Sequence, residues 1–379
     1  MRSLPASVVD PLRPLDSALR LAGESRLLSP PNPAVGCVIL SADHRCLGQG
    51  ATQAAGGPHA EIVALADAAA RGNPVAGATA YVTLEPCAHH GRTGPCCDAL
   101  ITAGIGKVVA AGVDPNPRVS GQGLARLRAA GVEVELLSPG DPLAQAARQL
   151  NIGFFSRMVR KIPWVRMKIA ASLDGRTALE NGASQWITSG AARADGHGWR
   201  ARAGAVLTGI GTVLEDDPRL DVRLVDTPRQ PHLVVVDSRL ETPLDAKLFI
   251  DGRKLFIYCA VPDEARQAAL RSRGATVIPL PGPGGKVDLA AMLRDLAMRE
   301  VNELHVEAGH KLNGSLIREG LVDEFLVYLA PLLLGHGRDM ASFGPLGALS
   351  QGVPLQFLGS EMVGSDLRLV ARIPGRDDF

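Results

Sequence analysis

The sequence predicts an α/β protein built from two domains. Its 379 residues exceed the usual size of one domain. In both halves, apolar strand-like runs alternate with helical patterns, which is typical of layered α/β folds. A break near Lys161-Ile162-Pro163 separates the two series. We therefore expect a disordered leader over residues 1–14, a first domain over 15–152 and a second domain over 162–379.

The first series has the pattern of a largely parallel sheet with helices between its strands. The strands expected in chain order are residues 35–40, 79–84, 107–111 and 133–137. Residues 60–70, which include Ile62, Val63 and Leu65, predict a buried helix. Further helices are expected at residues 97–103 and, as a link to the second domain, at residues 143–157.

The second series continues the alternation with more strands. We expect them at residues 164–171, 205–209, 233–237, 255–259, 276–279, 303–307 and 325–329. A helix is expected at about residues 311–319. The segment Pro281 to Gly285, with two prolines and three glycines, predicts a surface loop.

Composition restricts the classes of function. The formal net charge is +1, from 40 basic and 39 acidic residues, and no basic block suggests a nucleic-acid partner. No stretch approaches the roughly 20 apolar residues of a membrane span, and residues 1–13 lack the apolar core of a secretory signal. Six cysteines, several of them in a ligand-like pattern, favour a reducing cytoplasm over a disulfide scaffold.

One motif carries specific chemistry. His59-Ala60-Glu61 is followed by Pro86-Cys87 and then by Cys96. Zinc deaminases of nucleobases use an H-x-E motif and two later cysteines, with the glutamate off the metal. His59, Cys87 and Cys96 would fill three corners of a tetrahedron and leave the fourth for water, as in a catalytic zinc site. Glu61, near a predicted helix start, would then shuttle a proton to the departing amine.

Other interpretations of the same residues stay open at this point. A structural zinc would need a fourth protein ligand, which His89, His90 or Cys97 could supply. A single buried cysteine is more often a small packing residue than a ligand. We expect this packing role for Cys37, Cys46 and Cys259. The agreement of ligand types, off-metal glutamate and Pro-Cys step favours the catalytic zinc.

The second half carries weaker signals. No G-x-G-x-x-G follows its first strand, and Gly284-Gly285-Lys286 is not a P-loop. Gly209 and Gly309 each follow a predicted strand, where a phosphate could approach the backbone and a helix start could supply donors. Such glycines are also ordinary turn residues. Ser172 to Arg176 likewise fits a plain turn.

Taken together, these residues resemble the bifunctional deaminase/reductase family of riboflavin biosynthesis. The resemblance runs from about Leu15 to Ile373. It rests on segments that match at the level of residues: PNPAVGCV (31–38), GPHAE (57–61), TLEPCAHHGRTGPCC (83–97), DPNP (114–117), KIAASLDGRT (168–177), SQWIT (184–188), TGIGTVLEDDP (208–218), Asp237-Ser238 and VEAG (306–309).

The resemblance implies a cytidine-deaminase-like α/β/α domain followed by a dihydrofolate-reductase-like α/β domain. It implies that the first, with one Zn²⁺, hydrolyses the 2-amino group of 2,5-diamino-6-(5-phosphoribosylamino)pyrimidin-4(3H)-one. The second would then use NADPH to reduce the ribosyl group to ribityl. In the deaminase, the ligands would be His59, Cys87 and Cys96, the proton carrier Glu61, and the substrate contacts Asn32 and His89.

The resemblance also implies contacts in the reductase. Those to NADPH would be Ala170, Trp186, Thr212, Asp216, Ser238, Gly309, His310, Lys311, Leu312, Asn313, Gly314 and Ser315. Those to substrate would be Ser184, Arg200, Leu220, Arg223 and Glu307. Arg200 and Arg223 could bind the substrate phosphate bidentately, although each also fits an ordinary salt bridge. Trp186 alone would be interpreted as a core residue. The nicotinamide supplies the hydride chemistry, so no general acid is assigned here.

Two departures from the family pattern stand out. Gly94 occupies a position where relatives often have proline, and Thr52 one where they commonly have histidine. Neither alters a predicted metal ligand or Glu61, so both activities are expected. Rival hypotheses are a monofunctional deaminase with a binding module and a non-catalytic, zinc-stabilised interaction protein. The expected partners are small phosphorylated pyrimidines and further copies of the chain, as a dimer, with no membrane.

Overall fold

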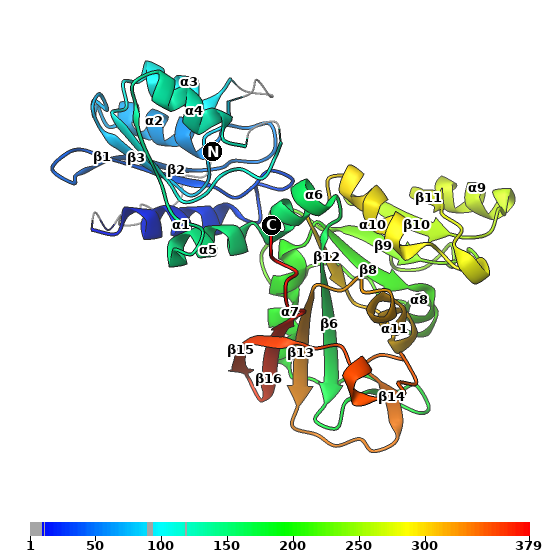
Figure 1. The fold of residues 1–379 in the computed structure, drawn as a ribbon. Coiled ribbons are helices and arrows are strands. Elements are labelled where there is room, and N and C mark those ends of the chain that lie inside the picture. The colour runs from blue at the N-terminus through cyan, green and yellow to red at the C-terminus, as the bar shows by residue number, and fades with distance from the viewer. Residues whose placement is uncertain (1–9, 11, 89–93, 118–119) are drawn as a thin grey trace. The chain divides into compact units, whose positions relative to one another are not determined.

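The chain folds into two compact units, Met1–Arg160 and Lys161–Phe379. A computed structural model describes residues 10, 12–88, 94–117 and 120–379, and Figure 1 shows their elements. Among these residues, no helix combines the length and the apolar character that crossing a membrane requires.

The first unit contains five strands and six helices among its described residues. In chain order they are α1 (Pro14–Ser25), β1 (Gly36–Leu40), β2 (Cys46–Ala51), α2 (Ala60–Ala70), β3 (Thr79–Val82), α3 (Cys96–Thr102), β4 (Lys107–Ala110), α4 (Gln122–Ala129), β5 (Glu133–Leu136), α5 (Pro142–Leu150) and α6 (Ile152–Arg160).

The sheet of this unit is mixed, so the expectation of a largely parallel sheet was wrong. Its strand order is β2-β1-β3-β4-β5. β1 pairs antiparallel with both β2 and β3, whereas β3–β4 and β4–β5 are parallel. A short connection between β1 and β2 permits only an antiparallel pair. The sequence did not predict β2, because its CLGQGA segment has two glycines and no β-branched residue.

The expected linking helix over residues 143–157 is two helices. Helix α5 ends at Leu150 and α6 begins at Ile152, so the break falls at Asn151. Asn151 has φ −111° and ψ 21°, outside the helical region. Its side chain is committed to hydrogen bonds with another segment of the chain, which competes with a continuous helix.

The second unit is larger. In chain order its elements are β6 (Trp164–Ser172), β7 (Arg176–Leu179), α7 (Gly190–Arg202), β8 (Ala205–Gly209), α8 (Ile210–Asp216), β9 (His232–Val236), β10 (Leu255–Cys259), α9 (Glu264–Ser272), β11 (Ala275–Pro279), η1 (Pro283–Gly285), α10 (Leu289–Met298), β12 (Glu303–Val306), α11 (His310–Arg318), β13 (Glu324–Ala330), β14 (Gly337–Asp339), η2 (Leu349–Gln351), β15 (Gln356–Val363) and β16 (Asp366–Arg372).

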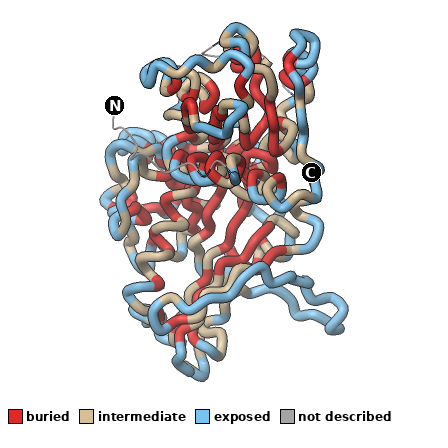
Figure 2. Tube along the Cα trace, turned by 90° about the vertical axis from the view of Figure 1, so that its left-hand side faces the viewer, coloured by how far each residue is buried: buried red, intermediate tan, exposed pale blue. Residues whose placement is uncertain are grey.

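A nine-stranded sheet organises this unit. Its order is β11-β10-β9-β8-β12-β6-β13-β16-β15, and β7 pairs separately with β14. The strands from β11 to β13 are parallel, while β16 and β15 add an antiparallel edge. The central strands are buried (Figure 2), as parallel strands covered on both faces must be. The sequence did not predict the β15–β16 hairpin, whose first strand is almost wholly exposed.

The order of parallel strands brings several strand ends to one edge. β9, β8, β12 and β6 are neighbours, and all four point the same way. Helix α8 follows β8 directly, and α11 begins four residues after β12 ends. In open α/β sheets, ligands bind at the carboxyl ends of the strands. The second unit therefore has a natural binding edge there.

Candidate functional site

The start of helix α2 positions two of the predicted deaminase residues. His59 is the N-cap residue, in an extended conformation, and Glu61 lies in the first turn. Glu61 is only 3% exposed. Burial raises its pKa to about 7 and outweighs the hydrogen bond from its own backbone N–H and the attraction of His59, which lower it. A buried carboxyl group with this pKa can gain or lose a proton near neutral pH.

Two further elements bring the cysteines to His59. Cys87 follows the loop after β3, and Cys96 is the first residue of α3. The backbone N–H of Cys97 donates to the carbonyl of Cys87 at 3.2 Å, and the N–H of Cys96 donates to Cys87 Sγ at 3.4 Å. A hydrogen bond from the Cys96 side chain lowers the pKa of Cys87, while the same contact and burial raise the pKa of Cys96. The pair therefore favours one thiolate, the form in which cysteine binds a metal.

The three side chains form one cluster that fits zinc. His59 Nδ1 lies 3.6 Å from Cys87 Sγ and 3.3 Å from Cys96 Sγ. All three donor atoms lie within 4.8 Å of one another. Tetrahedral zinc with ordinary Zn–N and Zn–S bonds would separate such atoms by about 3.6 Å. Among the described residues, no fourth histidine, cysteine or carboxylate joins them. His89 and His90 lie outside the described residues.

The segment before β1 holds the other predicted deaminase residue. Asn32 is half-buried and follows a Pro30–Pro31 pair. Thr52 is buried. Its hydroxyl accepts from the N–H of Val35 at 3.1 Å, and its backbone N–H donates to the carbonyl of Val35 at 2.9 Å. Threonine at this position therefore supports the segment that carries Asn32.

In the second unit, many predicted contacts lie at the binding edge of the sheet. Thr212 is in the first turns of α8, Ser238 follows β9, and Glu307 follows β12. A Cβ on Gly309 would lie 3.7 Å from Thr212 Oγ1, so the turns after β8 and β12 are adjacent. Ala170 lies in β6 beside them, and Asp216 is exposed at the end of α8.

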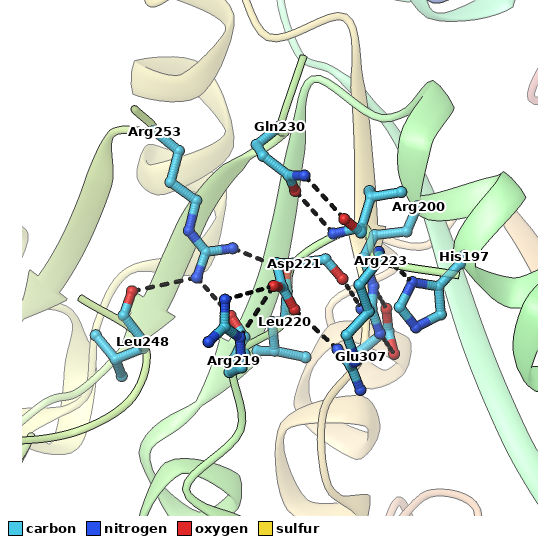
Figure 3. A network of polar contacts seen from close by, with 11 residues as sticks. His197, Arg200, Arg219, Leu220, Asp221, Arg223, Gln230, Leu248, Arg253 and Glu307 are labelled. Carbon is cyan, nitrogen blue, oxygen red and sulfur yellow. Dashed lines mark hydrogen bonds and ion pairs between the residues drawn. The ribbon is translucent and has the colours of Figure 1, made fainter. Parts of the chain in front are cut away.

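Arg200, which is buried, and Glu307, which is half-buried, form a bidentate ion pair at this edge. Arg200 Nε and Nη2 lie 2.7 Å and 3.0 Å from the two Glu307 oxygens, and Nη1 donates to the carbonyl of Asp221 (Figure 3). Burial alone would raise the pKa of Glu307, but Arg200, Lys168 and His305 outweigh it and lower that pKa. Both arginines meet carboxylates, but the Arg200 side chain is buried and that of Arg223 is half-exposed, so Arg223 is the more accessible of the two expected phosphate ligands.

Arg223 is held by a second carboxylate. Asp221 accepts from Arg223 Nη1 at 2.8 Å and from Arg219 Nε at 3.0 Å (Figure 3). The backbone N–H of Arg223 donates to His197 Nδ1 at 3.1 Å. Leu220, the remaining predicted contact in this loop, has a positive φ of 50°. Asp221 thus holds two half-exposed guanidinium groups in this loop, those of Arg219 and Arg223.

The 184–188 segment and helix α11 complete the predicted set. The Trp186 side chain is 64% exposed, so the interpretation of it as a core residue was wrong. Its ring lies 4.4 Å from the guanidinium of Arg193. Ser184, two residues earlier, is half-buried. An exposed indole and the N-terminus of α11 are groups that a nicotinamide dinucleotide could contact.

Within α11, two of the predicted residues are buried against the chain itself. Asn313 Nδ2 donates to the carbonyl of Met340 at 3.0 Å, while Asn313 Oδ1 has no partner among the described residues. A Cβ on Gly314 would approach the carbonyl oxygen of Ser342 to 1.9 Å. His310, Lys311 and Leu312 form the first turn and Ser315 follows Gly314. The segment 340–342 therefore crosses directly over this helix.

Comparison with known proteins settles the family. Residues 13–112 match the cytidine and deoxycytidylate deaminase zinc-binding region, and residues 163–369 match the RibD C-terminal domain. The riboflavin biosynthesis protein RibD of Escherichia coli is 43% identical over 361 residues, which cover 93% of this chain and 96% of that protein. The chain belongs to the RibD family. RibD of Aquifex aeolicus is 38% identical, covering 92% of this chain and 95% of that protein.

Solved RibD structures share the whole architecture. RibD of Acinetobacter baumannii has a TM-score of 0.85 and 39% identity, covering 94% of this chain and 97% of that chain. The deaminase/reductase of Thermotoga maritima has a TM-score of 0.83 and 30% identity, with coverage of 95% and 97%. The expected cytidine-deaminase-like and reductase fold classes are confirmed. This RibD chain is a zinc-dependent deaminase joined to an NADPH-dependent reductase of riboflavin biosynthesis.

The structure adds two residues that sequence reasoning missed in this RibD chain. Glu85 is buried, and its carboxylate accepts the backbone N–H groups of Asp114, Gly121, Gly123 and Leu124 at 2.8–3.3 Å. It thereby ties the loop before α4 to the Pro86-Cys87 step. Asp221 is the other. The sequence shows Glu85 two residues before Cys87, and Asp221 between Arg219 and Arg223. It does not show which groups these carboxylates bind.

Proposed function

We propose that this chain catalyses two consecutive steps of riboflavin biosynthesis. The first is hydrolytic deamination of 2,5-diamino-6-(5-phosphoribosylamino)pyrimidin-4(3H)-one, with release of ammonia. The second is NADPH-dependent reduction of the ribosyl group of the product to ribityl. Residues 15–152 would perform the first step and residues 162–379 the second. The observation that carries the proposal is the cluster of His59, Cys87 and Cys96 with the buried Glu61 beside it.

In the deaminase site, His59, Cys87 and Cys96 would hold the zinc. When bound, the zinc supplies a polarised water at neutral pH. Glu61 accepts a proton from this water and delivers it to the departing amine. Its burial excludes solvent from the transfer. Asn32 orients the pyrimidine, and His89, which lies outside the described residues, is assigned the same role on the resemblance alone.

In the reductase site, the chain would mainly bind and orient two ligands. NADPH supplies the hydride. The residues proposed to contact it are Ala170, Trp186, Thr212, Asp216, Ser238 and the stretch 309–315. Those proposed to contact the substrate are Ser184, Arg200, Leu220, Arg223 and Glu307. Arg223 is suited to the phosphate because its guanidinium is half-exposed while Asp221 fixes its position.

A coupled assay tests both steps. Purified protein with measured zinc content receives the diamino-pyrimidinone phosphate, and ammonia release and NADPH oxidation are followed separately. We expect ammonia first, then NADPH oxidation, with about one zinc per chain. Ammonia without NADPH oxidation would limit the second unit to binding. If zinc-loaded protein gives neither signal, the proposed substrate is rejected.

We also propose that the chain forms a homodimer through β15. This strand is at the edge of the nine-stranded sheet, and Phe357, Leu358 and Met362 are exposed on it, with Phe357 at 71%. An exposed apolar edge strand readily pairs with another chain. Light scattering should report a dimer, and Phe357→Glu should shift it toward the monomer. A wild-type monomer at micromolar concentration would refute this.

The proposed location is the cytoplasm. All six cysteines are described, and all six are free thiols. Cys37 and Cys259 are buried, as expected of packing residues. Free thiols are typical of reducing compartments. Fractionation of cells that express the tagged chain would test the location.

A further inference from the structure

Asn151, at the break between α5 and α6, reaches across the sequence to the segment that carries Asn32. Its Oδ1 accepts from the N–H of Ala34 at 2.7 Å, and its Nδ2 donates to the carbonyl of Ala34 at 2.8 Å. The two residues are 117 positions apart, and Asn151 is 6% exposed. One side-chain amide thus satisfies both backbone groups of Ala34, as a neighbouring strand would do.

Further contacts fix the same segment on either side of Asn32. Arg157 Nη2, on α6, donates to the carbonyl of Pro31 at 3.2 Å. Thr52 pairs with Val35, as described above. Pro33 joins Asn32 to Ala34 and restricts the backbone between them, because its ring locks φ and disfavours the helical region for the residue before it. Displacement of Ala34 would therefore move Asn32.

The strand register relates this segment to the metal ligands. β1 and β3 pair antiparallel, with Cys37 opposite Val82. Thr83 continues the pairing, because its N–H donates to the carbonyl of Gly36 and its Oγ1 accepts from the Gly36 N–H, both at 3.1 Å. The start of β1 and the end of β3 therefore lie side by side, and the segment that carries Asn32 and the loop that carries Cys87 leave the sheet at the same end.

We propose that Asn151 is a positioning residue of the deaminase, which holds Ala34 so that Asn32 meets the substrate. This inference rests on the proposed deamination and on the proposed contact of Asn32. It assigns a deaminase role to the junction of α5 and α6, which lies well beyond the residues 13–112 that match the zinc-binding region. The connecting helices are then part of the catalytic unit.

The first test replaces the amide in the full-length, zinc-loaded protein. Asn151→Ala removes both hydrogen bonds, and Asn151→Asp places an oxygen against the carbonyl of Ala34. We expect Asn151→Ala to raise KM for deamination about tenfold, the effect of one or two lost buried hydrogen bonds, with kcat changed much less. Zinc content and reduction of pre-deaminated substrate should stay at the wild-type level. Gln145→Ala, at an exposed glutamine of α5, is the matched control.

A double-mutant cycle tests whether Asn151 acts through Asn32. If it does, Asn32→Ala combined with Asn151→Ala should bind substrate no worse than Asn32→Ala alone. Additive effects would overturn the inference. An unchanged KM in Asn151→Ala, or parallel losses of zinc and kcat, would also overturn it, since the residue would then serve only stability.

Hydrogen exchange supplies a readout that does not depend on the substrate. The amide of Ala34 should exchange faster in Asn151→Ala than in the wild type, while amides of β4 stay unchanged. If the Ala34 amide of Asn151→Ala exchanges at the wild-type rate, the inference loses its basis. If the wild-type protein releases no ammonia, the proposed function fails, and this exchange experiment still decides whether Asn151 holds the segment.

Discussion

Two residues at the start of α2 have separate roles in the deaminase, one in metal binding and one in proton transfer. His59 offers its ring nitrogen to the cysteines, whereas Glu61, two residues later in the first turn, is buried and is not one of the three clustered ligands. One helix start holds both side chains, so the backbone of α2 fixes how far apart they attach. A carboxylate so placed can act on protons without competing for zinc.

Substitution of Glu61 should separate metal binding from catalysis. Glu61→Gln keeps the size of the side chain but removes its ability to carry a proton. We expect deamination to fall by about 100-fold or more, because general acid–base groups contribute at least that much. Zinc content and reduction of pre-deaminated substrate should persist. Glu24→Gln, at an exposed glutamate of α1, is the control, and loss of zinc in Glu61→Gln would contradict the assigned role.

Glu85 should support the metal through backbone hydrogen bonds. Glu85→Gln replaces one acceptor oxygen with a donor that would face N–H groups. We expect unfolding free energy to fall by about 1–3 kcal/mol and zinc affinity by about tenfold. Zinc transfer to a chromophoric chelator measures the second effect. Glu133→Gln, on exposed β5, should transfer zinc at the wild-type rate, and an equal rate in Glu85→Gln would refute the support.

At the scale of elements, the metal cluster depends on how closely helices approach the ligand loop, the segment 83–87 that ends at Cys87. Helix α3 begins at a ligand, and the N-terminal end of α4 packs against the residues before Cys87. Neither helix start has a side-chain cap. For α4, the carboxylate of Glu85 satisfies N–H groups that a capping residue would otherwise take.

Gly123 is where α4 and the ligand loop come closest. A Cβ at this position would approach the carbonyl oxygen of Pro86 to 1.9 Å. Gly123→Ala should therefore displace the loop, lower stability by about 1–3 kcal/mol and reduce zinc content when zinc is limiting. Gly140→Ala is the control, because a Cβ there meets nothing within 4 Å. Equal zinc contents, measured by atomic absorption, would count against this packing argument.

At the scale of the whole molecule, the reductase unit encloses charges in its sheet and neutral histidines in strand β12 and helix α7. Arg166 bridges Glu303 and Glu324, and Arg372 meets Glu324 as well. Burial lowers the pKa of His305 to about 3 and that of His197 to about 4. These histidines are uncharged when folded, so acid should favour the unfolded chain.

The reductase unit should lose stability as pH falls from about 6.5 toward 4. Below the ordinary histidine pKa of about 6.5, these two histidines bind protons in the unfolded chain but not in the folded unit. His197 and His305 should each cost about 1.4 kcal/mol per pH unit in this window. Trp164, Trp186 and Trp199 all lie in this unit, so urea unfolding followed by tryptophan fluorescence reports on it alone. Equal stability at pH 7 and pH 5 would contradict the assignment.

The sequence alone predicted those features that local pattern and residue chemistry carry. Strands such as β8 and β10 were found because they are continuous apolar runs, and helix α2 because its segment is rich in apolar residues. The His-Ala-Glu motif and the two later cysteines indicated zinc because few other uses need those residue types together. Strand β2 and the exposed β15 lacked such patterns, since glycine and solvent exposure weaken the signal.

Only the tertiary structure decided which distant groups meet. N–H groups from the loop before α4 and from its first turn converge on Glu85, Asn151 pairs with Ala34, and Arg200 meets Glu307 instead of remaining free for a phosphate. Nothing in the spacing of these residues predicts such contacts, because each depends on strand order and on helix placement. Ligand identity follows from side-chain chemistry, which the sequence states directly. The positioning of those ligands follows from long-range packing, which it does not.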